Sequence, residues 1–151
     1  MPKTLTLDEA YENCNSQGMF LPQQEVGIPR AKTMLLIAEE DLKTIQDIKE
    51  KKNRINTLYK LTYDVIHTLA EAFLLIDKVK SQNHQCLFAY LCYKHPELEF
   101  NWNFFETIRT KRNGIHYYGK GVIQDDWKEV SLQADIYIKL LIRKLKEQLS
   151  F

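Results

Sequence analysis

One segment of the chain brings together cationic, titratable and aromatic side chains that could act on a phosphodiester. It runs from Arg109 to Tyr118 and includes Arg112, Asn113 and His116. An imidazole can carry a proton near neutral pH, and a guanidinium stabilises the negative charge that grows on phosphoryl oxygens. The 2′-hydroxyl of RNA would be the nucleophile, so the segment predicts RNA cleavage without a metal ion and no activity on DNA.

Helical geometry decides which of these side chains can meet. On an unbroken helix Arg109 and His116 differ by about 20° in azimuth, and Arg112 lies within about 60° of both. Along the helix axis, His116 is about 6 Å from Arg112 and about 10 Å from Arg109. Arg112 is therefore the nearer partner, unless Gly114 distorts the helix. A second interpretation is structural: Arg and Lys satisfy the last carbonyl groups of a helix, and His and Tyr cover the core.

Long amphipathic helices must hold this segment in place. Pro29 suits a first helical turn, and the apolar stripe that follows it, as far as Ile48, predicts a helix of about five turns. A wider apolar stripe from Leu58 to Val79 predicts a second helix in the middle of the core.

Three more helices are expected after the second. The third begins with Ser81 as its N-cap and stops at Pro96, because the residue before a proline avoids the helical conformation. The fourth begins near Asn101 and is interrupted by Asn113, Gly114 and the loop Gly119, Lys120, Gly121. A last helix of about seven turns runs from residue 125 or 126 toward residue 149. The sequence therefore predicts an all-α fold, an up-and-down antiparallel bundle of four to five helices.

Residues 1–28 differ from the rest and form a predicted N-terminal arm, whereas residues 29–151 form the predicted bundle domain. Thr6 and Glu9 have the spacing of a capping box, which predicts a short helix through Tyr11. A polar connector follows as far as Gly27. The arm either packs on the body or on a partner, or it is disordered.

The composition limits the function classes. The 151 residues include 21 basic and 20 acidic side chains, a formal net charge of +1, so a nucleic-acid site must be a local patch. No stretch approaches about 18 uninterrupted apolar residues, and the start of the chain lacks the pattern of a signal peptide. We therefore expect a cytoplasmic protein with no membrane partner.

The three cysteines, Cys14, Cys86 and Cys92, are an odd number without the spacing of a disulfide framework. We therefore predict free thiols in a reducing compartment. A zinc set of Cys86 and Cys92 with His84 and His95 has unsuitable geometry. On one helix Cys86 points about 200° away from His84, and the two histidines are about 16 Å apart. We expect neither a metal site nor another cofactor.

Aromatic side chains are abundant for so narrow a bundle. Ten of those between residues 59 and 118 form the set from which we predict an interface: Tyr59, Tyr63, Phe73, Phe88, Tyr90, Trp102, Phe104, Phe105, Tyr117 and Tyr118. An isologous interface is the commonest way to cover such an excess, so we predict a homodimer.

Several sequence features occur together along residues 30–149. They are the amphipathic run 38–42, the second-helix run 69–74, the run 80–87, and an Arg-Asn pair at 112–113 before Tyr117 and Tyr118. This set resembles the HEPN family, small helical domains of prokaryotic toxin–antitoxin and defence systems that are often encoded beside a minimal nucleotidyltransferase. The resemblance implies a helical bundle that commonly forms a homodimer, with motifs of two subunits facing each other across a shared cleft.

The resemblance also implies an activity. Active family members are metal-independent endoribonucleases that use Arg, four to six residues, then His, a spacing that Arg109 and His116 meet. It implies His116 as general acid/base and Arg109 or Arg112 as the phosphate clamp. Further RNA or phosphate contacts are implied for Lys111, Asn113, Tyr117, Tyr118 and His84.

Toxin members of the family suggest a modification site. They have four residues between Arg and a His-x-Tyr motif, and the corresponding positions here are Lys111, His116 and Tyr118. In the toxin pairs the partner nucleotidyltransferase modifies this tyrosine with AMP. The resemblance therefore makes Tyr118 the candidate AMP acceptor and a minimal nucleotidyltransferase the candidate antitoxin.

A second alignment with the family leads to a different function. Many members have Arg-Asn, three residues, then His, and anchoring this spacing on Arg112 and Asn113 puts Tyr117 rather than His116 in the catalytic position. A phenol with a pKa of about 10 is a poor proton carrier at neutral pH. Under this alignment the chain is an inactive HEPN module that binds a nucleotidyltransferase partner or nucleotides.

His84 also has two interpretations. The family resemblance places it near the mouth of the cleft. The pattern of residues makes it a polar side chain in the first turn of the third helix, behind the N-cap Ser81.

Overall fold

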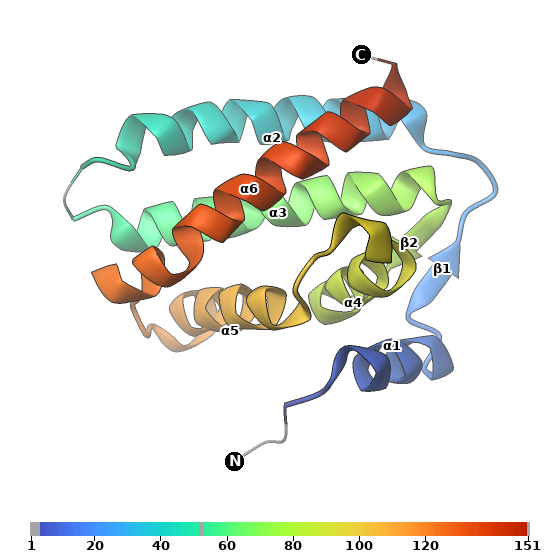
Figure 1. Cartoon of the computed structure of the whole chain (residues 1–151), viewed down its shortest axis with the longest axis horizontal. Helices are drawn as coiled ribbons and strands as arrows, with labels where there is room; N and C mark the ends of the chain where they lie inside the picture. The colour runs from blue at the N-terminus through green and yellow to red at the C-terminus, as the bar shows by residue number, and fades with distance from the viewer. Residues whose placement is uncertain (1–3, 52, 151) are drawn as a thin grey trace.

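The computed structural model describes residues 4–51 and 53–150 of the chain (Figure 1). This part folds into six α-helices, one short 3-10 helix and a two-stranded sheet. In chain order the elements are α1 (Leu7–Ser16), β1 (Phe20–Pro22), α2 (Ile28–Ile48), α3 (Ile55–Ile76), β2 (Val79–Ser81), α4 (His84–Lys94), η1 (Pro96–Leu98), α5 (Trp102–Tyr118) and α6 (Gln124–Leu149). The mostly helical bundle is confirmed, and the small sheet is an element that the sequence did not predict.

Helix α3 occupies the centre of the bundle. Figure 1 shows α2 beside α3, α6 crossing in front of both, and α4 and α5 on the other side of α3. The wide apolar stripe explains this position, because side chains on several sides of α3, among them Tyr63, Val65 and Leu69, are fully buried. None of the helices in the described ranges combines the length and apolar character that a membrane crossing needs.

The N-terminal arm packs on the body of the protein. The predicted capping box is confirmed, since the Thr6 hydroxyl accepts a hydrogen bond from the backbone of Glu9 and the Glu9 carboxylate accepts one from the backbone of Thr6. Helix α1 continues to Ser16, beyond the predicted end at Tyr11. The predicted polar connector contains strand β1, which pairs antiparallel with β2 and places Phe20 opposite Ser81. Hydrogen bonds along these strands therefore tie the connector to the segment before α4.

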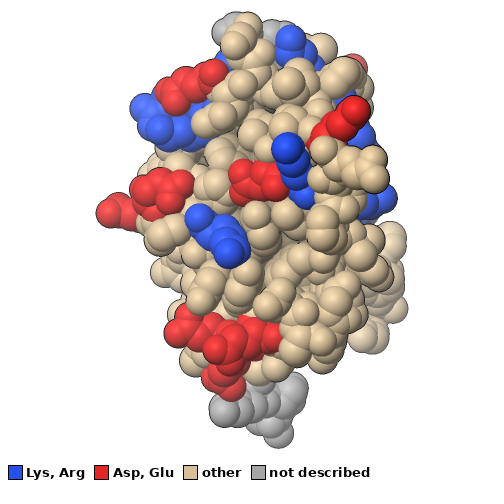
Figure 2. Space-filling model, turned by 90° about the vertical axis from the view of Figure 1, so that its right-hand side faces the viewer, with Lys and Arg blue, Asp and Glu red and all other residues tan. Residues whose placement is uncertain are grey.

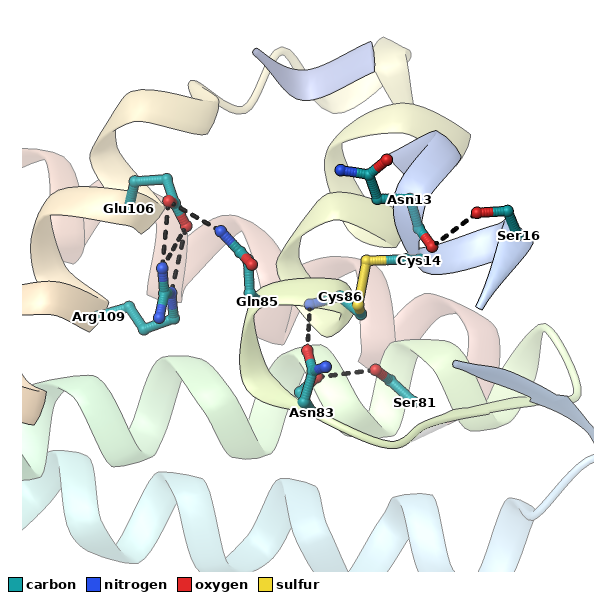
Figure 3. Close-up of a disulfide and its surroundings, with 9 residues drawn as sticks. All are labelled: Asn13, Cys14, Ser16, Ser81, Asn83, Gln85, Cys86, Glu106 and Arg109. Atoms are coloured by element: carbon teal, nitrogen blue, oxygen red, sulfur yellow. Dashed lines mark hydrogen bonds and ion pairs between the residues drawn. A yellow bond between two sulfur atoms is a disulfide. The ribbon is translucent and has the colours of Figure 1, made fainter. Parts of the chain in front are cut away.

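The prediction of three free thiols is wrong. Cys14 of α1 forms a disulfide with Cys86 of α4, with a Cα–Cα distance of 5.7 Å and a sequence separation of 72 residues (Figure 3). Cys92 is free and buried. The packing of α1 against α4 creates this proximity, and the cysteine spacing in the sequence carries no signal of it.

The predicted start of the helix that follows β2 is also wrong. Helix α4 begins at His84, with Asn83 as N-cap: the Asn83 side chain accepts a hydrogen bond of 2.8 Å from the backbone of Cys86. Ser81, the predicted N-cap, instead ends β2 and donates its hydroxyl to the carbonyl oxygen of Asn83. The strand pairing moves the helix start because it keeps Ser81 extended.

Helix α5 has no interruption at Asn113 or Gly114. It continues to Tyr118 and ends where Gly119 adopts a left-handed conformation with φ of 60°. The backbone N–H of Lys120 then donates to the carbonyl oxygen of Gly114, a common way to end a helix. Because the helix is unbroken, its side chains have the azimuths of a regular helix along its whole length.

The bundle hides most of the aromatic side chains from which we predicted a dimer interface. Eight of those ten are buried, and only Tyr117 and Tyr118, with 64% and 81% exposed surface, face solvent. The premise of an aromatic excess is therefore wrong, because the helices interlock their rings. Phe88 stacks on Phe105 with ring centroids 4.7 Å apart.

Breaking the disulfide should destabilise the fold. The variant Cys14→Ser is expected to lower the free energy of unfolding by about 2–4 kcal/mol, because the open chain gains conformational entropy when it unfolds. Urea unfolding with and without dithiothreitol measures this effect. The reductant should bring the wild type to the stability of Cys14→Ser and leave that variant unchanged. Cys92→Ala keeps the disulfide and should respond as the wild type does, and a wild type insensitive to the reductant would contradict the bond.

Candidate functional site

An open groove lies between the first turn of α4 and the second half of α5. Its volume is about 380 Å³. The side chains that line it are Gln82, Asn83, His84, Gln85, Arg109, Asn113 and Tyr117. Four of the predicted site residues, His84, Arg109, Asn113 and Tyr117, therefore meet here, and we call this site the α4–α5 groove.

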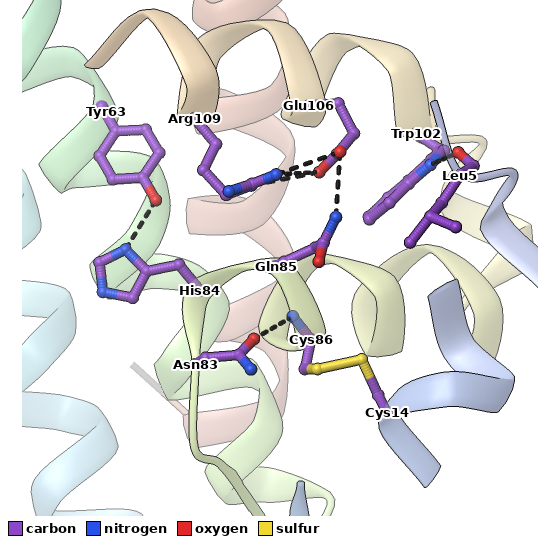
Figure 4. Close-up of polar contacts among 10 residues, drawn as sticks. All are labelled: Leu5, Cys14, Tyr63, Asn83, His84, Gln85, Cys86, Trp102, Glu106 and Arg109. Atoms are coloured by element: carbon purple, nitrogen blue, oxygen red, sulfur yellow. Dashed lines mark hydrogen bonds and ion pairs between the residues drawn. A yellow bond between two sulfur atoms is a disulfide. The ribbon is translucent and has the colours of Figure 1, made fainter. Parts of the chain in front are cut away.

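Arg109 of α5 lines the groove, and Arg112, one turn further along α5, lies outside the lining but acts on His84 through its charge. Arg109 makes a two-pronged ion pair with Glu106, with N–O distances of 3.0 and 3.1 Å, and Gln85 donates a hydrogen bond of 3.1 Å to the same carboxylate (Figure 4). Arg112 packs over the ring of Tyr63, with its guanidinium carbon 5.1 Å from the ring centroid. Its nearest carboxylate, that of Asp64, is 3.9 Å away. Arg112 therefore has a longer and weaker ion pair than Arg109 does.

An imidazole pair lies against these arginines. The Nδ1 atom of His84 is 2.8 Å from the hydroxyl oxygen of Tyr63 (Figure 4), and the ring of His67 lies 3.9 Å from that of His84. Burial, followed by the charges of Arg112 and Arg109, lowers the pKa of His84 below its usual range. Burial, His84 and Arg112 lower the pKa of His67 to about 3. Both rings are therefore neutral at pH 7, and His84 brings an uncharged imidazole to a cationic groove.

His116 lies at the exposed end of α5. Its ring packs edge-on against Tyr117, with centroids 4.7 Å apart, and it is not among the described residues that line the groove. Its charge and that of Arg112 both act on the Asp64 carboxyl, and both lower its pKa against the larger opposing effect of burial. His116 thus lies toward the same side of α5 as Arg112, while Tyr117 lines the groove.

The remaining predicted residues are distributed around α5. Lys111 is directed to α6, where its ammonium group lies 3.2 Å from the carboxylate of Asp126. Asn113 lines the groove, and its side-chain amide oxygen accepts a hydrogen bond of 3.4 Å from the Arg112 guanidinium. Tyr118 is 81% exposed, which leaves its hydroxyl open to solvent.

Sequence reasoning missed four polar residues at the groove, of which Gln85 lines it and the others lie next to the lining residues. These are Tyr63 and His67 of α3, Gln85 of α4, and Glu106 of α5. The first two stand one turn apart in an otherwise apolar stripe, so they share a face of α3, and that spacing was the available signal. Gln85 and Glu106 carry no such signal, because they meet only through the packing of α4 on α5.

The zinc set considered from the sequence is dispersed by the fold. Within residues 4–51 and 53–150, no group of three or more His, Cys, Asp and Glu side chains could hold a metal ion. Cys86 is in the disulfide, His84 pairs with Tyr63, and His95 lies 2.5 Å from the carboxylate of Asp77.

The protein surface agrees with a local site. On the face shown in Figure 2, Lys and Arg side chains lie among Asp and Glu side chains, so the described part of this face has no uniformly basic patch. The whole chain has a formal net charge of only +1, so attraction for an anion depends on local charges such as Arg109 in the groove and Arg112 near it.

Comparison of the chain with family models, with curated proteins and with solved structures finds no match.

The lowered pKa of His67 makes a specific contribution to stability. In the unfolded chain a histidine has a pKa of about 6.5, so below that pH the unfolded state binds a proton at this residue and the folded state does not. Protonation therefore stabilises the unfolded state relative to the folded state. The stability from this residue is complete above pH 6.5 and falls as the pH drops toward about 3, by at most about 1.4 kcal/mol per pH unit. Urea unfolding at pH 7.5, 6 and 5 should give a shallower loss for His67→Gln than for the wild type. Equal losses in the two proteins would contradict the buried neutral imidazole.

Proposed function

We propose that this chain is a HEPN-like protein of a toxin–antitoxin or defence system that binds RNA in the α4–α5 groove. The observation that carries the proposal is that His84 and Arg109 line one groove, where burial and the charges of Arg112 and Arg109 lower the pKa of the His84 imidazole. Guanidinium groups suit phosphate oxygens because their planar N–H groups match the geometry of the anion. The nearly neutral whole chain makes such a local cluster necessary for binding RNA.

The proposed reaction is cleavage of the RNA backbone without a metal ion. The 2′-oxygen attacks the adjacent phosphorus, the bond from phosphorus to the 5′-oxygen breaks, and a 2′,3′-cyclic phosphate and a 5′-hydroxyl form. His84 takes the proton of the 2′-hydroxyl, since its lowered pKa keeps it unprotonated at pH 7. Arg109 and Arg112 hold the charge that grows on the phosphoryl oxygens.

A second proton-transfer group must protonate the leaving 5′-oxygen. His116 is the proposed donor, because it lies toward the Arg112 side of α5 and its exposed ring is open to a substrate or to a second subunit. The predicted homodimer would bring two such ends together across a shared cleft. His84 and His116 then divide the base and acid roles, as two imidazoles do efficiently at neutral pH.

A non-catalytic function is the second candidate, and the exposure of Tyr118 favours it. Tyr118 is 81% exposed as a residue, so its phenol hydroxyl is accessible to an enzyme that transfers AMP. In this function the chain binds nucleotides or a minimal nucleotidyltransferase, and Tyr118 accepts the AMP group. The groove would then bind the phosphate of a ligand without cleaving it.

Binding of RNA should depend on Arg112. The variant Arg112→Gln is expected to weaken binding of a fluorescein-labelled single-stranded RNA about tenfold or more, because a charge-assisted contact with phosphate is lost. Fluorescence anisotropy at several salt concentrations measures the effect. The slope of the logarithm of the binding constant against the logarithm of the salt concentration should become shallower by about one. Arg143→Gln on α6 lies outside the groove and is the matched control. Equal weakening by both variants would overturn the assignment of the groove.

Cleavage should depend on the 2′-hydroxyl and on the imidazoles. In the presence of EDTA, the wild type is expected to cut an RNA oligonucleotide and to leave its 2′-deoxy copy intact. His84→Ala should slow cleavage by about 10²–10⁴-fold, and His116→Ala should slow it as well. A His84→Ala protein with normal activity would remove His84 from the reaction and leave His116 as its base. RNA that binds and stays intact would favour the non-catalytic function.

A further inference from the structure

A second cavity lies between α2, α3 and α6, lined by none of the side chains that form the α4–α5 groove. Its volume is about 450 Å³, within the range of pockets that bind small organic molecules. The side chains that line it include Ile45 of α2, Thr62 of α3, and Trp127, Leu132 and Ile138 of α6. We call it the α2–α6 cavity.

Two hydroxyl groups beside this cavity are buried and unpaired. The side-chain oxygens of Thr62 and Tyr59 have no hydrogen-bond partner in the described part of the chain. Thr62 lines the cavity and is 2% exposed, and Tyr59 lies edge-on to the cavity residue Trp127, with ring centroids 6.4 Å apart. An unpaired buried hydroxyl costs free energy, and a bound polar group removes that cost. Because a helical threonine adopts two side-chain rotamers, this hydroxyl can turn to a ligand in the cavity.

The walls and the rim of the cavity define the rest of the ligand. Branched aliphatic side chains such as Ile45 and Ile138 and the indole ring of Trp127 form the apolar part of the walls, and polar side chains such as Gln46 and Ser131 form the rest. The charged side chains at the cavity are two lysines and two acids, and one pair, Lys139 with Asp135, is closed at 2.9 Å. Leu132, at the cavity, is 72% exposed and extends the apolar surface outward. The rim is therefore balanced in charge, and the walls favour an uncharged ring.

We propose that the α2–α6 cavity is a binding site for a small neutral aromatic compound with one hydroxyl group. The ring lies between Trp127 and the aliphatic walls, and the hydroxyl pairs with Thr62. This site is independent of the proposed RNA groove, so either proposal can fail without the other.

Two matched probes, 2-naphthol and naphthalene, test the site. The chain has two tryptophans, and in a ¹H–¹⁵N NMR spectrum the indole signal of Trp127 should shift on titration with 2-naphthol. The indole of Trp102, which donates a hydrogen bond of 3.0 Å to the carbonyl oxygen of Leu5 in the arm, should stay in place and serves as internal control. The signals are assigned from the spectrum of Trp102→Phe. We expect 2-naphthol to bind about fivefold more tightly than naphthalene, the worth of one net hydrogen bond.

The variant Thr62→Val isolates the hydroxyl at nearly constant volume. It should reduce the affinity for 2-naphthol to that for naphthalene and leave the affinity for naphthalene unchanged. Thr62→Ser keeps a hydroxyl and should retain the preference for 2-naphthol, which guards against a variant that does not fold. The proposal is overturned if neither probe shifts Trp127, if both indoles shift alike, or if the wild type binds the two probes equally.

Discussion

The position of the first turn of α4 is the constraint on which the groove depends. Three interactions hold this turn in place: a helix cap, a disulfide and a strand pairing. The Asn83 side chain caps the helix, and the Cys14–Cys86 disulfide joins the third residue of α4 to α1. The pairing of β2 with β1 ends at Ser81, just before the cap. His84 and Gln85 lie inside this fixed turn, so their side chains meet α5 in one defined register. The N-terminal arm is thus part of the structure that positions the groove.

Burial and positive charge act in the same direction on the imidazoles of the groove. Each alone disfavours protonation, and together they keep His84 and His67 neutral while Arg109 and Arg112 stay charged. Two protonated rings 3.9 Å apart would repel each other, so neutrality is also what allows them to pack closely. The Tyr63 hydroxyl, bonded to Nδ1 of His84, then fixes the orientation of the ring.

The sequence predicted the elements that depend on local patterns and missed those that depend on distant contacts. Periodicity and capping located the long helices and the Thr6–Glu9 cap, because both signals lie within a few residues. The disulfide and the two-stranded sheet join residues far apart in the chain, and no local pattern encodes them. For the site, helical azimuth brought Arg112 and His116 to one side of α5. It could not show that the groove lies along the side of α5 that carries Arg109, Asn113 and Tyr117, so that Arg112 and His116 fall outside its lining.

The disulfide also changes the covalent topology of the chain. Cys14 and Cys86 close a ring that contains β1, α2, α3 and β2, and so encloses the central helix together with its partner α2. The short link between α2 and α3 lies within this ring. A protease that cuts this link would yield two pieces still joined through sulfur. The nicked protein would migrate as one species until a reductant separates them.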